Sequence, residues 1–231
     1  MIARCVLFVL SLVLAACSGS RAEHAEHGDE HHAHGDRVPH HGSAREYAAR
    51  LDDPSRAVWQ MPERVVSASG VGVGMRVADL GTGSGYFVPA LSSAVGATGS
   101  VLGEDIDAAL LDIAREHAAA AHLANVTFRQ GTPDDPMLEA GSYDRVFLVD
   151  TYHHIENRPA FLAHVRGSLR PGTGRFVVID FRDGDLPVGP PPGHKLPRAQ
   201  VERELRENGF TIEREETFLP YQYLLVAAPN A

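Results

Sequence analysis

The chain has 231 residues, a length that suits one domain with a tail, and 44% of them are hydrophobic, which is enough for a sizeable core. Its formal net charge of -9 argues against a general binder of nucleic-acid phosphates. The two cysteines, Cys5 and Cys17, both lie within the first twenty residues, so the rest of the chain has neither a disulfide nor a thiol nucleophile.

Residues 1–16 have the pattern of a signal peptide. Arg4 is followed by an almost wholly apolar run up to Ala16, which is shorter than the roughly 20 residues needed to span a bilayer. The letters LAAC at 14–17 resemble the lipobox of bacterial lipoproteins. The resemblance implies cleavage before Cys17, lipidation of that residue and, because Ser18 follows it, anchoring in the outer membrane facing the periplasm. The alternatives are an ordinary signal peptide, or a start codon placed too early, which would leave the protein in the cytoplasm.

Residues 17–45 lack apolar periodicity, so they cannot bury a core and are expected to form a disordered tether. The segment is rich in histidine, glutamate and aspartate. Neutral imidazole is a good ligand for zinc, copper and nickel. Weak metal sites would draw on His24, His27, His31, His32 and His34. Because no fixed ligand geometry is implied, a solvated tether without a specific metal site is the favoured interpretation.

From residue 46 to residue 231 the sequence alternates between apolar strands and amphipathic helices. Strands are expected at 75–81, 100–106, 125–131, 143–150 and 174–181, and helices at 86–95, 108–122, 158–172 and 197–210. The segments 211–220 and 221–229 are too close for a crossover helix and should form an antiparallel hairpin. This pattern predicts an α/β fold, a doubly wound, seven-stranded, mostly parallel Rossmann-like sheet with its ligand site at the carboxyl ends of the strands.

The stretch VADLGTGSGYF, at 77–87, combines a buried strand with a glycine turn. Gly81, Gly83 and Gly85 are spaced G-x-G-x-G, and Tyr86 stands where a dinucleotide-binding fingerprint would have its third glycine. No Lys-Ser/Thr pair of a phosphate-binding loop follows. The carboxylate of Asp79 would repel a pyrophosphate, but it suits a ligand with an ammonium or sulfonium charge.

VADLGTGSG resembles motif I of the class I methyltransferases that use S-adenosylmethionine. The resemblance covers roughly residues 57–229, and it includes the terminal hairpin that distinguishes this family from NAD-binding folds. It implies that Asp79 and the three glycines of the turn contact S-adenosylmethionine. A nicotinamide oxidoreductase is a weaker alternative, because Tyr86 and the hairpin oppose it.

Three further motifs match the family in order and imply roles for single residues. After the second strand, Asp105 would bind both ribose hydroxyls and Ile106 would pack on the adenine. The neighbouring Glu104 departs from the family, which more often has an apolar residue there. After the third strand, Asp135 or Asp134 would meet the adenine amine. After the fourth strand, Asp150 would lie near the methionyl end.

His153 and His154 are the catalytic candidates, because they form the only histidine pair at the carboxyl end of a strand. The helical flap expected at 52–66 would place Trp59 over the cofactor, near the acceptor, or in the core. The predicted function is methyl transfer to a small-molecule or lipid acceptor, without a nucleic-acid partner and with membrane attachment through the lipid anchor. The alternative is an exported, non-catalytic binding protein of the same fold with a metal-binding tether.

Overall fold

The computed structural model describes residues 43–230. The expected signal peptide, the lipobox with Cys17 and nearly all of the histidine-rich segment lie outside the described residues. Those predictions include His24, His27, His31, His32 and His34.

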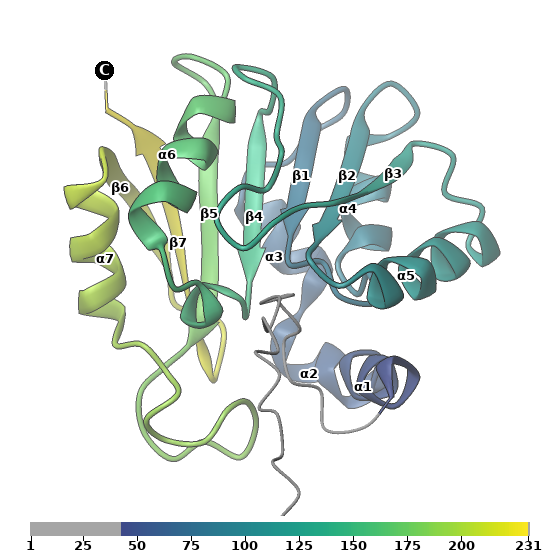
Figure 1. Ribbon diagram of the computed structural model, residues 1–231, viewed down its shortest axis with the longest axis horizontal. Helices are drawn as coiled ribbons and strands as arrows, with labels where there is room; N and C mark the ends of the chain where they lie inside the picture. Colours follow the sequence, from purple (N-terminus) through teal and green to yellow (C-terminus); the bar gives the residue numbers. More distant parts are fainter. Residues whose placement is uncertain (1–42, 231) are drawn as a thin grey trace, which may run out of the picture. The chain divides into compact units, whose positions relative to one another are not determined.

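A seven-stranded sheet forms the centre of the described part, with the strand order β3-β2-β1-β4-β5-β7-β6 (Figure 1). The strands are β1 (Arg76–Leu80), β2 (Ser100–Asp105), β3 (Val126–Gln130), β4 (Arg145–Val149), β5 (Arg175–Phe181), β6 (Phe210–Glu216) and β7 (Gln222–Pro229). Strands β1 to β5 pair in parallel, whereas β7 pairs antiparallel with both β5 and β6. The predicted fold class and the predicted terminal hairpin are therefore confirmed.

Helices pack on the sheet and at one of its edges. They are α1 (Ala44–Leu51), α2 (Ala57–Gln60), α3 (Pro62–Ala68), α4 (Val88–Val95), α5 (Ala108–Ala120), α6 (Arg158–Ser168) and α7 (Arg198–Glu207), with short 3₁₀ turns η1 (Pro54–Arg56) and η2 (Tyr152–His154). The predicted helices correspond to α4, α5, α6 and α7. The expected flap is present as η1, α2 and α3. Among residues 43–230, no helix is long and apolar enough to cross a bilayer.

The two faces of the sheet carry separate hydrophobic clusters, because successive strand residues point to opposite sides. In β1, Ala78 and Leu80 pack with α6 and α7 in one cluster. Val77 packs with α3 and α4 in the other. Helices thus cover both faces, as a mostly parallel sheet requires.

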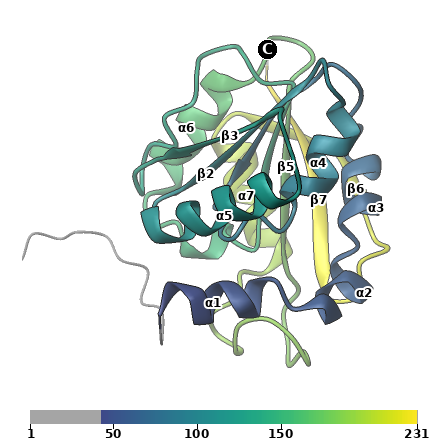
Figure 2. The ribbon, with the colours of Figure 1, turned by 90° about the vertical axis from the view of Figure 1, so that its right-hand side faces the viewer.

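Helix α1 begins at Ala44, two residues before the expected start of the domain. It starts with a capping box, in which Ser43 accepts from the Glu46 backbone N–H and the Glu46 carboxylate accepts from the Ser43 backbone N–H. The helix packs against α5 through Ala48, Leu110 and Ile113. Figure 2 shows α1 along the same edge as the segment that joins β5 to α7.

The order of the strands reverses between β1 and β4, which are neighbours in the sheet but not in sequence. At such a switch point the loops that follow the two strands separate, and a crevice opens at their carboxyl ends. The glycine turn follows β1, and Asp150 follows β4. The fold therefore brings these two predicted site elements to one place.

Candidate active site

A cavity of about 430 Å³ opens at the carboxyl edge of the sheet. Its walls come from α1, the glycine turn, the ends of β2 and β4, the start of the β3–β4 connection and η2. The residues that line it are Tyr47, Leu51, Arg56, Asp79, Gly81, Thr82, Gly83, Ser84, Tyr86, Phe87, Glu104, Asp105, Ile106, Leu110, Thr132, Pro133, Leu148, Val149, Asp150, Thr151, His154, Ile155, Glu156 and Phe161. The lining includes most of the residues that the sequence selected.

The glycine turn is fixed by hydrogen bonds to the strand ends beside it. Thr82 donates its backbone N–H to the Glu104 carbonyl at 2.9 Å and its hydroxyl to Asp79 Oδ2 at 2.7 Å. Gly83 donates its N–H to Asp105 Oδ2 at 2.8 Å. Gly81 has a φ of 64°, and a Cβ there would collide with the Thr151 side chain. The turn thus needs glycine both for its backbone angle and for its close contact with the β4 loop.

Three carboxyl groups gather at the base of the cavity, on Asp79, Glu104 and Asp105, and all three residues are buried. Burial raises the pKa of Asp79 to about 7, and the nearby Asp105 adds to the rise. Burial also raises the pKa of Glu104 well above its usual value, and Asp105 and Asp79 raise it further. This part of the cavity favours a ligand that carries positive charge.

Asp150 occupies the opposite side of the glycine turn, in a left-handed backbone conformation with a φ of 53°. Its Oδ2 accepts from Gln60 Nε2 at 2.8 Å, and its Oδ1 accepts from Gln222 Nε2 at 2.5 Å. Burial raises the pKa of Asp150 to about 7, Asp180 adds to this rise, and Arg56 opposes it. A strained residue held by two buried amides indicates a site whose geometry is fixed before a ligand arrives.

Arg56 is the one positively charged side chain in the cavity lining that the structure describes, apart from the titratable His154. Its guanidinium lies 4.6 Å above the Tyr86 ring and 3.7 Å from Asp150 Oδ2. It also donates to Gln60 Oε1 at 2.9 Å and to the Leu51 carbonyl. The sequence analysis did not identify Arg56, because nothing in the local pattern DDPSRAVWQ distinguishes it from a surface arginine.

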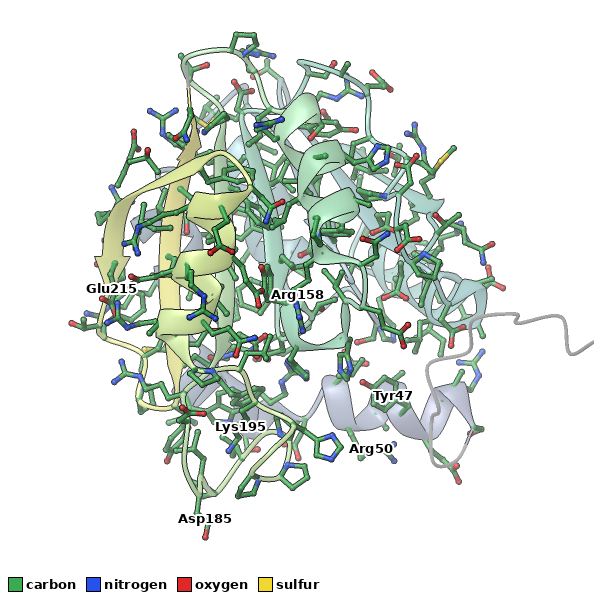
Figure 3. The ribbon with its side chains drawn as sticks, turned by 60° about the vertical axis from the view of Figure 1, so that its left-hand side comes forward. Tyr47, Arg50, Arg158, Asp185, Lys195 and Glu215 are labelled. Atoms are coloured by element: carbon green, nitrogen blue, oxygen red, sulfur yellow. The ribbon has the colours of Figure 1, made fainter. Side chains whose placement is uncertain are left out.

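Helix α1 closes one side of the cavity, where Tyr47 and Leu51 line it. Figure 3 shows Tyr47 and Arg50 on this helix. The end of the helix is tied to the glycine turn, because Ser84 Oγ donates to Asp52 Oδ1 at 2.6 Å. The predicted flap is thus joined by a second covering element that the sequence analysis did not anticipate.

The two catalytic candidates differ in their surroundings. His154 lines the cavity, and burial together with the neighbouring His153 lowers its pKa below the usual value, so it is neutral at neutral pH. His153 is not in the lining. Its Nδ1–H donates to the buried Asp180 carboxylate at 2.9 Å. In residues 43–230, no group of three or more His, Cys, Asp or Glu residues is arranged to hold a metal ion.

The residues expected around an adenine are only partly brought together. Ile106, Thr132 and Pro133 line the cavity. Asp135 does not. Its Oδ1 accepts from the Met137 backbone N–H at 2.7 Å and lies 3.5 Å from His164 Nδ1.

Trp59 packs beside the site rather than in it. Its ring centroid lies 5.9 Å from that of Phe181 and 6.2 Å from that of Tyr221. The nearby connection from β5 to α7 carries Asp185 and Lys195 (Figure 3). Lys195 is buried, and its Nζ donates to the Gly184 carbonyl at 2.9 Å, which ties this connection to itself.

Comparison with known proteins identifies the architecture. A sequence model described as a methyltransferase domain matches residues 77–172. The crystal structure of a SAM-dependent methyltransferase from Aquifex aeolicus superposes with a TM-score of 0.76 at 27% identity, covering 80% of this chain and 98% of the other. The chain has the class I methyltransferase fold. These findings support a methyltransferase enzyme with S-adenosylmethionine as its cofactor.

Two curated methyltransferases are similar in sequence to part of this chain. A demethylmenaquinone methyltransferase of Staphylococcus aureus is 31% identical over 57% of this chain and 52% of its own length. An arsenite methyltransferase of Aquipseudomonas alcaligenes is 31% identical over 61% of this chain and 45% of its own length. The chain therefore spans about half the length of these curated relatives, and their two named acceptors differ in chemistry.

Proposed function

We propose that this protein transfers a methyl group from S-adenosylmethionine to a small organic acceptor. One observation supports this most strongly. The cavity at the β1–β4 switch point brings together a glycine turn, buried carboxyl groups and a single guanidinium. The methyltransferase fold and the matched domain model agree with this proposal.

The charges of the cavity fit those of the cofactor. S-adenosylmethionine carries a sulfonium, an ammonium and a carboxylate, and the cavity offers several buried acids and Arg56. A volume of about 430 Å³ lies within the range of small-molecule sites, roughly 300–1,000 Å³. The residues present therefore fit the group.

Each part of the cofactor has candidate partners. Asp105 lines the cavity, and its carboxylate would accept from the ribose hydroxyls. Ile106 would pack on the adenine. Asp150 would face the methionyl ammonium, and Arg56 would bind the methionyl carboxylate. Asp79 would keep the glycine turn in shape through Thr82.

The bound cofactor supplies an electrophilic methyl group on a sulfonium. The chain aligns the acceptor with it and keeps water out, tasks that suit the covering helix α1 and the aromatic lining. His154, neutral at the cavity wall, is placed to take a proton from an acceptor hydroxyl or amine at an imidazole nitrogen. His153 would act indirectly, by packing its ring 4.1 Å from that of His154.

The lining favours an uncharged or cationic organic acceptor, lipids included. Tyr47, Tyr86, Phe87, Ile155 and Phe161 give it an apolar and aromatic character. The excess of acidic side chains over one arginine disfavours an anion. The cysteines that a soft inorganic acceptor such as arsenite would favour are absent from residues 43–230.

The proposed location of the enzyme is the periplasmic face of the outer membrane, with Cys17 as the lipidated residue. The support for this is the sequence LAAC at 14–17 after an apolar run. Metabolic labelling with a tagged fatty acid would mark the chain, and Cys17→Ser would remove the label. Label that survives Cys17→Ser, or its absence from the unaltered chain, would exclude this anchor.

Calorimetry on the full chain purified in detergent tests the cofactor. The expected result is micromolar binding of S-adenosylmethionine, which Asp105→Ala abolishes. Asp112→Ala, on the exposed face of α5, is the matched control and should bind normally. Absence of binding by the unaltered, folded chain would refute the proposed function. Formation of S-adenosylhomocysteine with a panel of neutral phenols, hydroquinones and amines then tests the acceptor class.

A further inference from the structure

Glu104 is an acidic residue at the base of the cavity that the family pattern does not call for. It lies at the end of β2, with Leu80 beside it in β1 and Arg129 beside it in β3. The residue is only 3% exposed, yet it lines the cavity. Its carboxyl group is therefore exposed to a bound ligand but largely hidden from bulk water.

The space around Glu104 is shaped for its side chain. A Cβ at Gly131 would collide with Glu104 Oε1 and would lie close to Cδ. Glycine at the end of β3 therefore leaves the room that the carboxyl group occupies. This fit shows that the glutamate is part of the packed structure and does not merely point outward from an edge.

The charged groups that act most strongly on Glu104 are negative. Asp105 from β2, Asp79 from β1 and Asp135 from the β3–β4 connection each raise its pKa, whereas the Gly81 backbone N–H lowers it. The neighbouring Arg129 is engaged elsewhere, since it donates to the Met137 carbonyl. No ion pair with a basic side chain forms at Glu104 within residues 43–230.

A buried carboxyl group without a cationic partner destabilises a folded protein when it ionises. It becomes favourable when a cation enters the same space. Glu104 lines the cavity, so a sulfonium bound there shares that space with its carboxyl group. The product of methyl transfer, S-adenosylhomocysteine, has an uncharged sulfur, so it carries one positive charge fewer to interact with this carboxylate.

We propose that Glu104 is a specificity residue that makes the site bind the sulfonium cofactor more tightly than its thioether product. The inference rests on the proposed function. The Glu104 carboxyl group stabilises the positive charge on the sulfur of bound S-adenosylmethionine. When methyl transfer removes this charge, the stabilisation is lost and the product is held less strongly. The residue thereby favours release of the product.

Calorimetry with S-adenosylmethionine and S-adenosylhomocysteine tests this on the full chain, its Glu104→Gln variant and the control Glu207→Gln at the exposed end of α7. The unaltered chain should bind S-adenosylmethionine more tightly than S-adenosylhomocysteine. Glu104→Gln should reduce the ratio of the two affinities by about threefold or more, the size expected for one partly screened charge.

The outcomes separate the inference from the proposed function. If the unaltered chain binds neither compound, the proposed function is wrong and the inference falls with it. If it binds both and the ratio is the same in Glu104→Gln, the cofactor assignment stands and the role of Glu104 is refuted. If Glu104→Gln does not fold, Glu104→Met, which also removes the charge, must give the reduced ratio.

Discussion

The His153 side chain is paired with the buried carboxylate of Asp180 and does not line the cavity. Its Nδ1 lies 2.9 Å from Oδ1, and its backbone N–H donates to Oδ2 at 3.2 Å. Phe181 donates its backbone N–H to Oδ1 at 2.8 Å. Asp180 is fully buried, so these donors replace its water. His154, the next residue, lines the cavity instead.

Replacement of His153 should therefore mainly reduce stability, whereas replacement of His154 should mainly reduce activity. We expect His153→Ala to lower the free energy of unfolding by about 3 kcal/mol, because it removes the side-chain partner of the buried Asp180 carboxylate and leaves only backbone donors. His154→Ala should change stability by less than about 1 kcal/mol and lower kcat for any acceptor that must lose a proton. Urea denaturation and initial rates measure the two effects. The exposed His164→Ala is the control, and equal loss of stability in both variants would contradict the assignment.

Because Asp79 is buried, we expect Asp79→Asn to gain stability relative to the unaltered chain as the pH rises. The pKa of Asp79 is about 7 in the folded protein and ordinary in the unfolded chain, so the folded state binds more protons between these values. Stability is then lost as pH rises towards 7. Relative to the unaltered chain, the variant should gain about 2–3 kcal/mol between pH 5 and pH 8. Denaturation at the two pH values measures this gain.

The comparison must be made against the unaltered chain at each pH. His154, whose pKa is lowered, changes stability in the opposite direction below about pH 6.5. Asp112→Asn, on the exposed face of α5, should show no pH-dependent difference. A constant difference in Asp79→Asn would mean that the Asp79 carboxyl group ionises normally.

The sheet and its order were predictable because each strand is an apolar run bounded by turns and separated by amphipathic helices. Helix α1 was missed, since it is short and follows a polar, histidine-rich segment. A local signal was nevertheless present, because Ser43 and Glu46 have the spacing of a capping box. Packing against α5 stabilises this short helix, although the sequence before it is polar.

The hydrogen-bond network around Asp150 could not be predicted from local sequence. Gln60 lies 90 residues before Asp150 and Gln222 lies 72 residues after it, and only the completed sheet brings the three together. The same holds for Arg56. By contrast, the glycine motif and the family resemblance pointed to Asp79 and Asp105, and the structure places both near the carboxyl end of a strand, where parallel topology brings them to one edge of the sheet.

Substitution of Gly81 by alanine should reduce stability more than substitution of other glycines with similar backbone angles. Gly81→Ala places a Cβ against the Thr151 side chain, at a φ of 64°. Gly172 has a similar φ of 74°, but a Cβ there would have no atom within 4 Å. Gly172→Ala should therefore cost only the backbone strain, about 1–2 kcal/mol. We expect Gly81→Ala to cost at least about 1 kcal/mol more, measured by urea denaturation. Equal losses would show that the turn moves freely away from β4.

Removal of the Arg56 guanidinium should selectively weaken the binding of ligands that carry the methionyl carboxylate. Arg56→Ala should weaken S-adenosylmethionine binding by roughly 10–100-fold, the range for a lost hydrogen bond between charged groups. Binding of 5′-methylthioadenosine, which has no carboxylate, should change far less. Arg64→Ala, an exposed arginine over the Phe218 ring, is the matched control. Because Arg56 also holds Gln60 and the Leu51 carbonyl, an equal loss for both ligands would show that it supports the fold of the site and does not contact the carboxylate.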